Sequence, residues 1–233
     1  ILETLTKAHS AVNHAQAFID LACELRQQVD LQQVREVVVH TNSTVHNIVG
    51  SGSNDPEKYD PDASRETLDH SLAYIVAVAL EDGCFHHEHS YAYERAHRFE
   101  TSDLWRRVHS VIDPSWDALY RQALLDRPAL GGRLAIHLND GRVISGEKAV
   151  ADAHTRGARP MDHAGYVAKF RTLAGPVLAS EVLEAFLSLV HGLPDATPEA
   201  LSRLNPPLPP GRLHTDKLDG RGIFDHGLVV TDR

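Results

Sequence analysis

Apolar and polar residues recur along the chain with the periods of helices and, in fewer places, of strands. In residues 11–25 the apolar side chains return every three or four positions, which predicts a helix with one apolar face. Residues 64–80 carry a similar stripe that becomes apolar on nearly every side, so this helix is expected to be buried. Ser10 and Ser64 are suitable N-caps for these helices, and Gly83 marks the end of the second. The same spacing predicts further helices over residues 101–110, 114–125, 162–173 and 179–189.

Other segments have the pattern of strands. Residues 35–41 are a short β-branched run that predicts one strand. Residues 134–138 and 142–146 flank an Asp-Gly pair at 140–141, which predicts a β-hairpin. The resulting order of helix, strand, helices, hairpin and helices indicates an α+β fold, in which helices cover a small, mainly antiparallel sheet. Residues 51–56 and 60–62 are expected to be loops, and the proline-rich tail at 205–213 to be extended.

Composition and charge narrow the range of partners. The 233 residues carry a formal net charge of −9, which argues against nucleic acid because phosphate binding favours a basic face. With only Cys23 and Cys84, the chain has neither a disulfide framework nor the thiolates that an iron–sulfur cluster usually needs. The longest apolar run, residues 72–80, is too short to span a membrane, and no signal peptide is recognisable. We therefore expect a cytoplasmic protein without nucleic-acid or membrane partners.

Residues 84–97 form a histidine-rich stretch, Cys-Phe-His-His-Glu-His-Ser-Tyr-Ala-Tyr-Glu-Arg-Ala-His. Its histidines, glutamates and cysteine are residue types that bind transition metals. On a helix His86 and His89 would share a face and His87 would point away, so the stretch does not itself supply a third ligand. Neither a His-Glu-x-x-His nor a Cys-x-x-Cys spacing occurs in the chain. We therefore expect no metal site here and a structural role for the stretch.

Four separate motifs occur in the order in which they stand in a known family. They are Gly-Ser-Asn-Asp-Pro-Glu-Lys at 52–58, Ala-Ser-Arg-Glu-Thr-Leu-Asp-His-Ser at 63–71, Cys-Phe-His-His-Glu at 84–88 and Gly-Ile-Phe at 222–224. Together they resemble the 2-methylcitrate dehydratases of the MmgE/PrpD family, and the resemblance covers nearly the whole chain. The first motif departs from the family pattern, because only Ser53 stands between Gly52 and Asn54.

The resemblance also implies an architecture. Residues 1–233 would form the C-terminal lid domain of such a protein, with its C-terminal helices and tail. The flanking helices would pack on a large all-helical N-terminal domain, and the active site would lie in the cleft between the two domains. The chain starts at Ile1 without an initiator Met, so we expect it to be a piece of a longer protein that lacks this helical domain. We further expect a homodimer, no cofactor and no activity of this piece alone.

The resemblance carries over candidate site residues. Lys7, His14 and Gln16 match the family's spacing of Lys and His-x-Gln, although residues 9–12 read His-Ser-Ala-Val where the family usually has Tyr-Pro-Ala-Glu. Tyr74 stands in the Ser-x-x-Tyr pattern of the predicted buried helix, with His70 one turn before it on the same face. The implied catalytic residues are Lys7, His14 and Tyr74, and the implied substrate-binding residues are His70, Arg65, Gln16 and Asn54. Arg65 alternatively pairs with Asp62 or Asp69.

These residue types suit the implied reaction, a metal-independent dehydration of the tricarboxylate 2-methylcitrate to 2-methyl-cis-aconitate in propionate breakdown through the methylcitrate cycle. Lys7 can bind a carboxylate or a developing enolate-like charge, and His14 titrates near neutrality and can act as acid or base. Tyr74 can donate a proton to the leaving hydroxyl. Two alternatives stay open: decarboxylation of cis-aconitate or another lyase reaction of the family, and a non-catalytic module that mediates assembly or binds metal.

Overall fold

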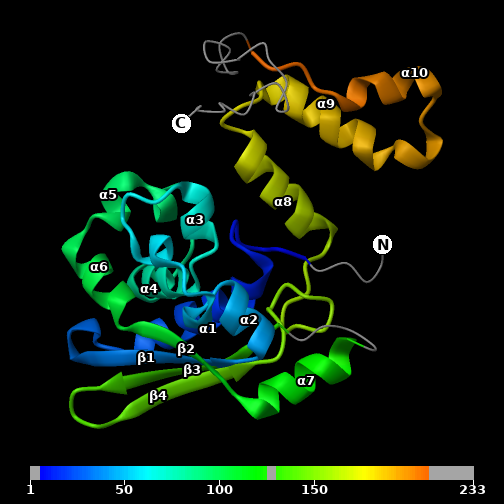
Figure 1. Ribbon diagram of the computed structural model, residues 1–233. Helices are drawn as coiled ribbons and strands as arrows, with labels where there is room; N and C mark the ends of the chain where they lie inside the picture. Colours follow the sequence, from blue (N-terminus) through cyan, green and yellow to red (C-terminus); the bar gives the residue numbers. More distant parts are fainter. Residues whose placement is uncertain (1–5, 125–129, 210–233) are drawn as a thin grey trace, which may run out of the picture. The chain divides into compact units, whose positions relative to one another are not determined.

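The computed structural model describes residues 6–124 and 130–209, in two compact units divided after Asp162. The first unit holds a β-sheet with helices α1 to α7, and the second, from His163, is helical in its described part (Figure 1). The α+β fold expected from the sequence is confirmed. The Gly-Ile-Phe motif at 222–224 lies outside the described residues. Within residues 6–124 and 130–209, no helix has both the length and the apolar character needed to cross a membrane.

The sheet of the first unit is mainly antiparallel, as predicted. Its strands stand in the order β2–β1–β3–β4, with β1 at Val34–Thr41, β2 at Val108–Ile112, β3 at Gly132–Leu138 and β4 at Val143–Lys148. β1 pairs antiparallel with β3, and β3 pairs antiparallel with β4 through the predicted hairpin. Gly141 in the hairpin turn has a φ of 86°, a left-handed conformation that glycine adopts without the strain a Cβ would cause.

The first three residues of the strand β2, residues 108–110, lie in a segment whose pattern predicts a helix. The helix predicted over residues 101–110 is α6 (Phe99–Arg106), and the chain continues as β2, parallel to β1. In β2 Val108 and Ser110 are buried while the residues that alternate with them are more exposed, which is the two-residue period of a strand. The strand is only five residues long, so this short alternation was hidden behind the stronger helical pattern that precedes it.

Helices α1 (Gln16–Leu25) and α4 (Leu72–Asp82) lie side by side on one face of the sheet (Figure 1). α1 packs against β3 and β4, and α4 packs against β2, α1 and α6. Every residue of α4 from Leu72 to Leu80 is buried, as its apolar sequence predicted. The other helices of this unit are α2 (Ser43–Ile48), α3 (Arg65–Asp69), α5 (Tyr93–Ala96) and α7 (Pro114–Leu124).

The helix predicted over residues 64–80 is in fact two helices, because Ser71 interrupts it. The Ser71 Oγ accepts a hydrogen bond from the backbone N–H of Tyr74 at 3.2 Å, which caps α4. The same Oγ donates to the carbonyl of Lys58 at 2.7 Å. A tertiary contact therefore fixes where α4 begins, and the sequence pattern alone does not reveal it.

This break corrects the predicted relation between His70 and Tyr74. His70 is the C-cap of α3 and lies outside α4, whereas Tyr74 belongs to the first turn of α4. The two residues do not share one helical face, so the predicted placement of His70 one turn before Tyr74 on the same helix is wrong. The start of α1 is corrected similarly: Ser10 does not cap it, and a 3-10 turn at Asn13–Ala15 precedes Gln16.

The second unit contains α8 (His163–Ala174), α9 (Ser180–His191) and α10 (Pro198–Leu201). The rings of Phe170 and Phe186 stack with centroids 5.0 Å apart, and they join α8 to α9. The Arg171 guanidinium also donates to both carboxylate oxygens of Glu184, at 2.9 and 2.7 Å. Both predicted helices are thus confirmed, and the expectation that they pack on an N-terminal helical domain stays a prediction.

Replacing the interrupting residue tests how strongly it defines the break. We expect Ser71→Ala to lower the free energy of unfolding by about 1–2 kcal/mol, because a helix cap and a buried hydrogen bond are both lost. Ser64→Ala is the matched control, since Ser64 caps α3 at an exposed position and its removal should cost about 0.5 kcal/mol. Urea denaturation of the complete protein measures the free energy of unfolding of both variants. Equal decreases in the two variants would contradict a special role for Ser71.

Candidate functional site

His14 lies in the 3-10 turn that precedes α1, with its imidazole partly buried. Its buried Nδ1 has no hydrogen-bond partner in the described part of the chain. Burial lowers the pKa of His14 below its ordinary value, and the neighbouring basic groups of His70 and Lys7 lower this pKa further. The neutral imidazole is therefore favoured near neutral pH, and this is the form that can accept a proton.

We call Lys7, His14 and His70 the cationic cluster, after the Lys7 ammonium; the two imidazoles are basic groups that carry a charge only when protonated. Lys7 and His70 are the two sequence-predicted residues whose charges lower the pKa of His14. Lys7 is exposed, and the His70 side chain is 52% exposed at the end of α3, where its Nδ1 donates to the Glu66 carbonyl at 2.9 Å. The exposed Lys7 ammonium would attract an anion such as a carboxylate.

Tyr91 holds the loop of residues 9–12 against the end of α3. Its hydroxyl lies 2.8 Å from the Ser10 carbonyl and 3.1 Å from the Asp69 carboxylate, close enough to donate to either. The Val12 N–H donates to the Asp69 carbonyl at 3.4 Å, which adds a backbone link between the same segments. Burial and the neighbouring Asp69 carboxylate raise the pKa of Tyr91, so its hydroxyl keeps its proton and acts as a donor.

Arg65 contributes a further positive charge beside these residues. Its guanidinium lies 4.7 Å from the centre of the Tyr91 ring, and its Nη2 donates to the His87 carbonyl at 3.2 Å. These contacts differ from the pairing with Asp62 or Asp69 that the sequence left open. Arg65 is exposed, so its side chain can also meet a ligand.

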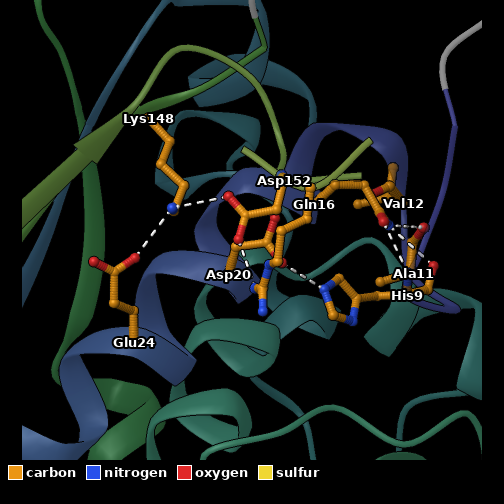
Figure 2. Close-up of polar contacts among 9 residues, drawn as sticks. His9, Ala11, Val12, Gln16, Asp20, Glu24, Lys148 and Asp152 are labelled. Atoms are coloured by element: carbon orange, nitrogen blue, oxygen red, sulfur yellow. Dashed lines mark hydrogen bonds and ion pairs between the residues drawn. The ribbon is translucent and has the colours of Figure 1, made fainter. Parts of the chain in front are cut away.

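Gln16 and Asn54 take positions that differ from those of the cluster residues. Gln16 is only 2% exposed, and its side-chain amide bonds to the backbone of the 9–12 loop (Figure 2). It therefore supports the loop, and its polar atoms are engaged there rather than offered to a substrate. Asn54 is exposed with a left-handed φ of 53°, and its Nδ2 donates to the Gly52 carbonyl within its own loop. Substrate binding by Asn54 stays a prediction.

Tyr74 is a core residue of α4. Its side chain is fully buried, and its hydroxyl donates to the Ser90 carbonyl at 2.6 Å. The ring packs edge-on against Trp105 with centroids 4.9 Å apart, and it stacks on Tyr91 with centroids 6.3 Å apart. Burial raises the pKa of Tyr74, so the phenol is a poor proton donor to a substrate. The catalytic assignment of Tyr74 stays a prediction, and the site described here does not rely on it.

The histidine-rich stretch stacks its rings. His86 lies 4.3 Å, centre to centre, from both His87 and His89, and its Nδ1 accepts hydrogen bonds from the backbone N–H groups of Glu88 and His89. Across the described ranges no group of three His, Cys, Asp or Glu side chains is arranged to hold a metal ion. The stretch shapes the turn after α4, and this turn carries Tyr91 to the 9–12 loop.

One comparison with known proteins decides the family. The family model of the MmgE/PrpD C-terminal domain matches residues 9–193, which is most of the chain. The chain belongs to the MmgE/PrpD family. Membership in the MmgE/PrpD family supports a lyase-type role at the level of the family.

Several residues that shape this MmgE/PrpD site were not singled out from the sequence. Tyr91 was named only as part of the histidine-rich stretch, and Asp69 only as a possible partner of Arg65. His9 and Asp20, which contact each other at 2.8 Å beside the 9–12 loop, carried no recognisable motif. Their roles depend on contacts between segments far apart in the sequence, so spacing along the chain gave no signal for them.

The charge environment of His14 gives a direct test of the cationic cluster. In the complete MmgE/PrpD protein we expect Lys7→Ala and His70→Ala each to raise the pKa of His14, because each removes a positive neighbour that disfavours protonation. Nuclear magnetic resonance titration of the His14 ring measures this pKa. Arg121→Ala, which removes an exposed cation paired with Asp117, should leave it unchanged. An unchanged His14 pKa in both cluster variants would show that the three groups do not interact.

Proposed function

We propose that this chain is the lid part of a hydro-lyase that converts 2-methylcitrate to 2-methyl-cis-aconitate and water. The proposal is carried by membership in the MmgE/PrpD family together with a partly buried His14, whose pKa is lowered by burial, by His70 and by Lys7. A tricarboxylate is strongly anionic at neutral pH, and a site with several basic groups matches its charge. In this proposal cationic side chains bind the carboxylates, a task for which other enzymes use a metal ion.

The proposed roles follow from the state of each group. Lys7, an ammonium, binds a substrate carboxylate and stabilises the negative charge that develops when the neighbouring carbon loses its proton. His14, kept neutral by burial and by its basic neighbours, accepts that proton. His70 and Arg65 bind other carboxylates from the exposed side. The C–O bond then breaks, the C=C bond forms, and the hydroxyl leaves as water with a proton from an acid that we place outside this chain.

The proposal also includes the partners expected from the sequence. The acid and the opposite wall of the cleft would come from an all-helical N-terminal domain, and the protein would act as a homodimer. One observation supports the need for a further domain: the described part of the second unit leaves large apolar side chains exposed. These are Tyr166, Leu173, Val177, Val190, Leu193, Leu201 and Leu208.

Activity of the complete protein on 2-methylcitrate tests this function. We expect His14→Gln to lower kcat/KM by about 10²–10⁴-fold, because a positioned base is lost. Lys7→Ala should lower kcat/KM by about 10²-fold or more, because the developing charge loses its counter-charge. His97→Gln is the control, since His97 pairs with the exposed Asp62 and should leave kcat/KM unchanged.

The products separate the remaining alternatives. Formation of 2-methyl-cis-aconitate without carbon dioxide supports the dehydratase. Release of carbon dioxide from cis-aconitate, with no turnover of 2-methylcitrate, would instead identify a decarboxylase. If neither substrate reacts, and a metal lost on His86→Ala is present in stoichiometric amount, the chain would be a metal-binding module and the proposal would be refuted.

A further inference from the structure

A network of polar contacts surrounds the loop of residues 9–12, which lies between two members of the cationic cluster. Figure 2 shows side chains of α1 reaching this loop in one direction and the segment after β4 in the other. The loop of residues 9–12 has Lys7 just before it and His14 just after it. The contacts that hold this loop therefore also set the distance between the Lys7 ammonium and the His14 imidazole.

Gln16 holds the backbone of the loop. Its Oε1 accepts from the His9 N–H at 3.0 Å, and its Nε2 donates to the His9 carbonyl at 3.1 Å and to the Ala11 carbonyl at 3.0 Å (Figure 2). A weaker contact of 3.4 Å reaches the Val12 carbonyl. Gln16 is the first residue of α1 and is buried, so these bonds tie an irregular loop to a rigid helix.

Asp20 holds the same loop through a side chain, one helical turn further along α1. Its Oδ1 lies 2.8 Å from His9 Nε2, and its Oδ2 accepts from the Asp152 N–H at 2.7 Å. The Asp20 side chain is only 8% exposed, and both of its carboxylate oxygens are engaged in these contacts. Asp20 thus links the loop to the segment that follows β4.

The far side of the network is fixed by ion pairs. The Asp152 carboxylate accepts from Lys148 Nζ at 2.9 Å and from Arg159 Nη2 at 2.7 Å. Lys148 also pairs with Glu24 of α1 at 3.0 Å. Asp152 is therefore held at both its carboxylate and its backbone, and it provides a fixed point to which Asp20 is anchored.

We propose that Gln16 and Asp20 are positioning residues of the cationic cluster, which fix the 9–12 loop, and with it Lys7 and His14, without touching the substrate. This inference rests on the proposed function, because it assigns the two residues to the placement of its base and its counter-charge. A displacement of about 1 Å in a catalytic group can cost about 10²-fold in rate, so a loop held this way matters for turnover.

Variants of the complete protein test the inference. We expect Asp20→Ala to lower kcat by about 10–100-fold while KM changes less, because the groups are misplaced but the charges that bind substrate remain. Hydrogen exchange of the amides of residues 9–13 should become faster in the same variant. Asp20→Asn should recover most of kcat, since its oxygen can accept from Asp152 N–H and its amide can donate to neutral His9 Nε2.

Two further variants complete the design. Glu24→Ala is the matched control, because Glu24 lies one turn beyond Asp20 on α1 and belongs to the network without contacting the loop. It should leave kcat and the exchange of residues 9–13 unchanged. His9→Ala removes the His9–Asp20 contact from the loop side and should lower kcat as Asp20→Ala does. His9→Ala thus decides the question if Asp20→Ala fails to fold.

The possible results separate this inference from the proposed function. If kcat of Asp20→Ala or His9→Ala stays within about twofold of wild type, or if Glu24→Ala lowers kcat equally, the inference is overturned. If wild type turns over neither 2-methylcitrate nor cis-aconitate, the proposed function fails instead. In that case hydrogen exchange of residues 9–13 is the remaining test of whether Asp20 fixes the loop. Exchange that is unchanged in Asp20→Ala would overturn the inference.

Discussion

The complete burial of α4 is the constraint on which the rest of the first unit depends. The helix is enclosed by α1, α6 and the sheet, and none of its residues from Leu72 to Leu80 faces solvent. Each Å² of apolar surface that is buried stabilises the fold by about 25 cal/mol. A shift of α4 would expose part of this surface to water, and the helix is therefore held in one position against its neighbours. Its two ends then determine where the polar segments on either side of it lie.

The candidate site uses both ends of this helix. Before α4 the chain turns at Ser71 and presents His70, and after α4 the histidine-rich stretch returns Tyr91 to Asp69 and Ser10. The loop that carries Lys7 and His14 is thus held between a buried helix and a buried glutamine. The folded core thus holds the 9–12 loop in place on both sides.

The sequence predicted most of the fold and named candidate residues for the site. Helical and alternating periods located most of the helices and the hairpin, because burial on one face leaves a repeating pattern. The break at Ser71 was missed because the apolar stripe runs on through it, and the cause is a hydrogen bond to the distant Lys58. The resemblance to the MmgE/PrpD family named Lys7, His14 and Tyr74 as candidates. The structure shows that the Tyr74 phenol is buried and donates to a backbone carbonyl, whereas Lys7 and His14 flank the 9–12 loop. Spacing along the chain cannot distinguish a buried side chain from one beside a loop.

A double-mutant cycle on the complete protein tests the central claim that Lys7 and His14 act on one bound anion. The quantity measured is kcat/KM for 2-methylcitrate in wild type, Lys7→Ala, His14→Gln and the double variant. If the two groups act on the same bound anion, the fold-loss of kcat/KM in the double variant is much smaller than the product of the two single fold-losses. Once one group has been removed, the other group contributes little to transition-state stabilisation, so its removal costs little more. Losses that multiply independently would contradict the account, as would single variants as active as wild type.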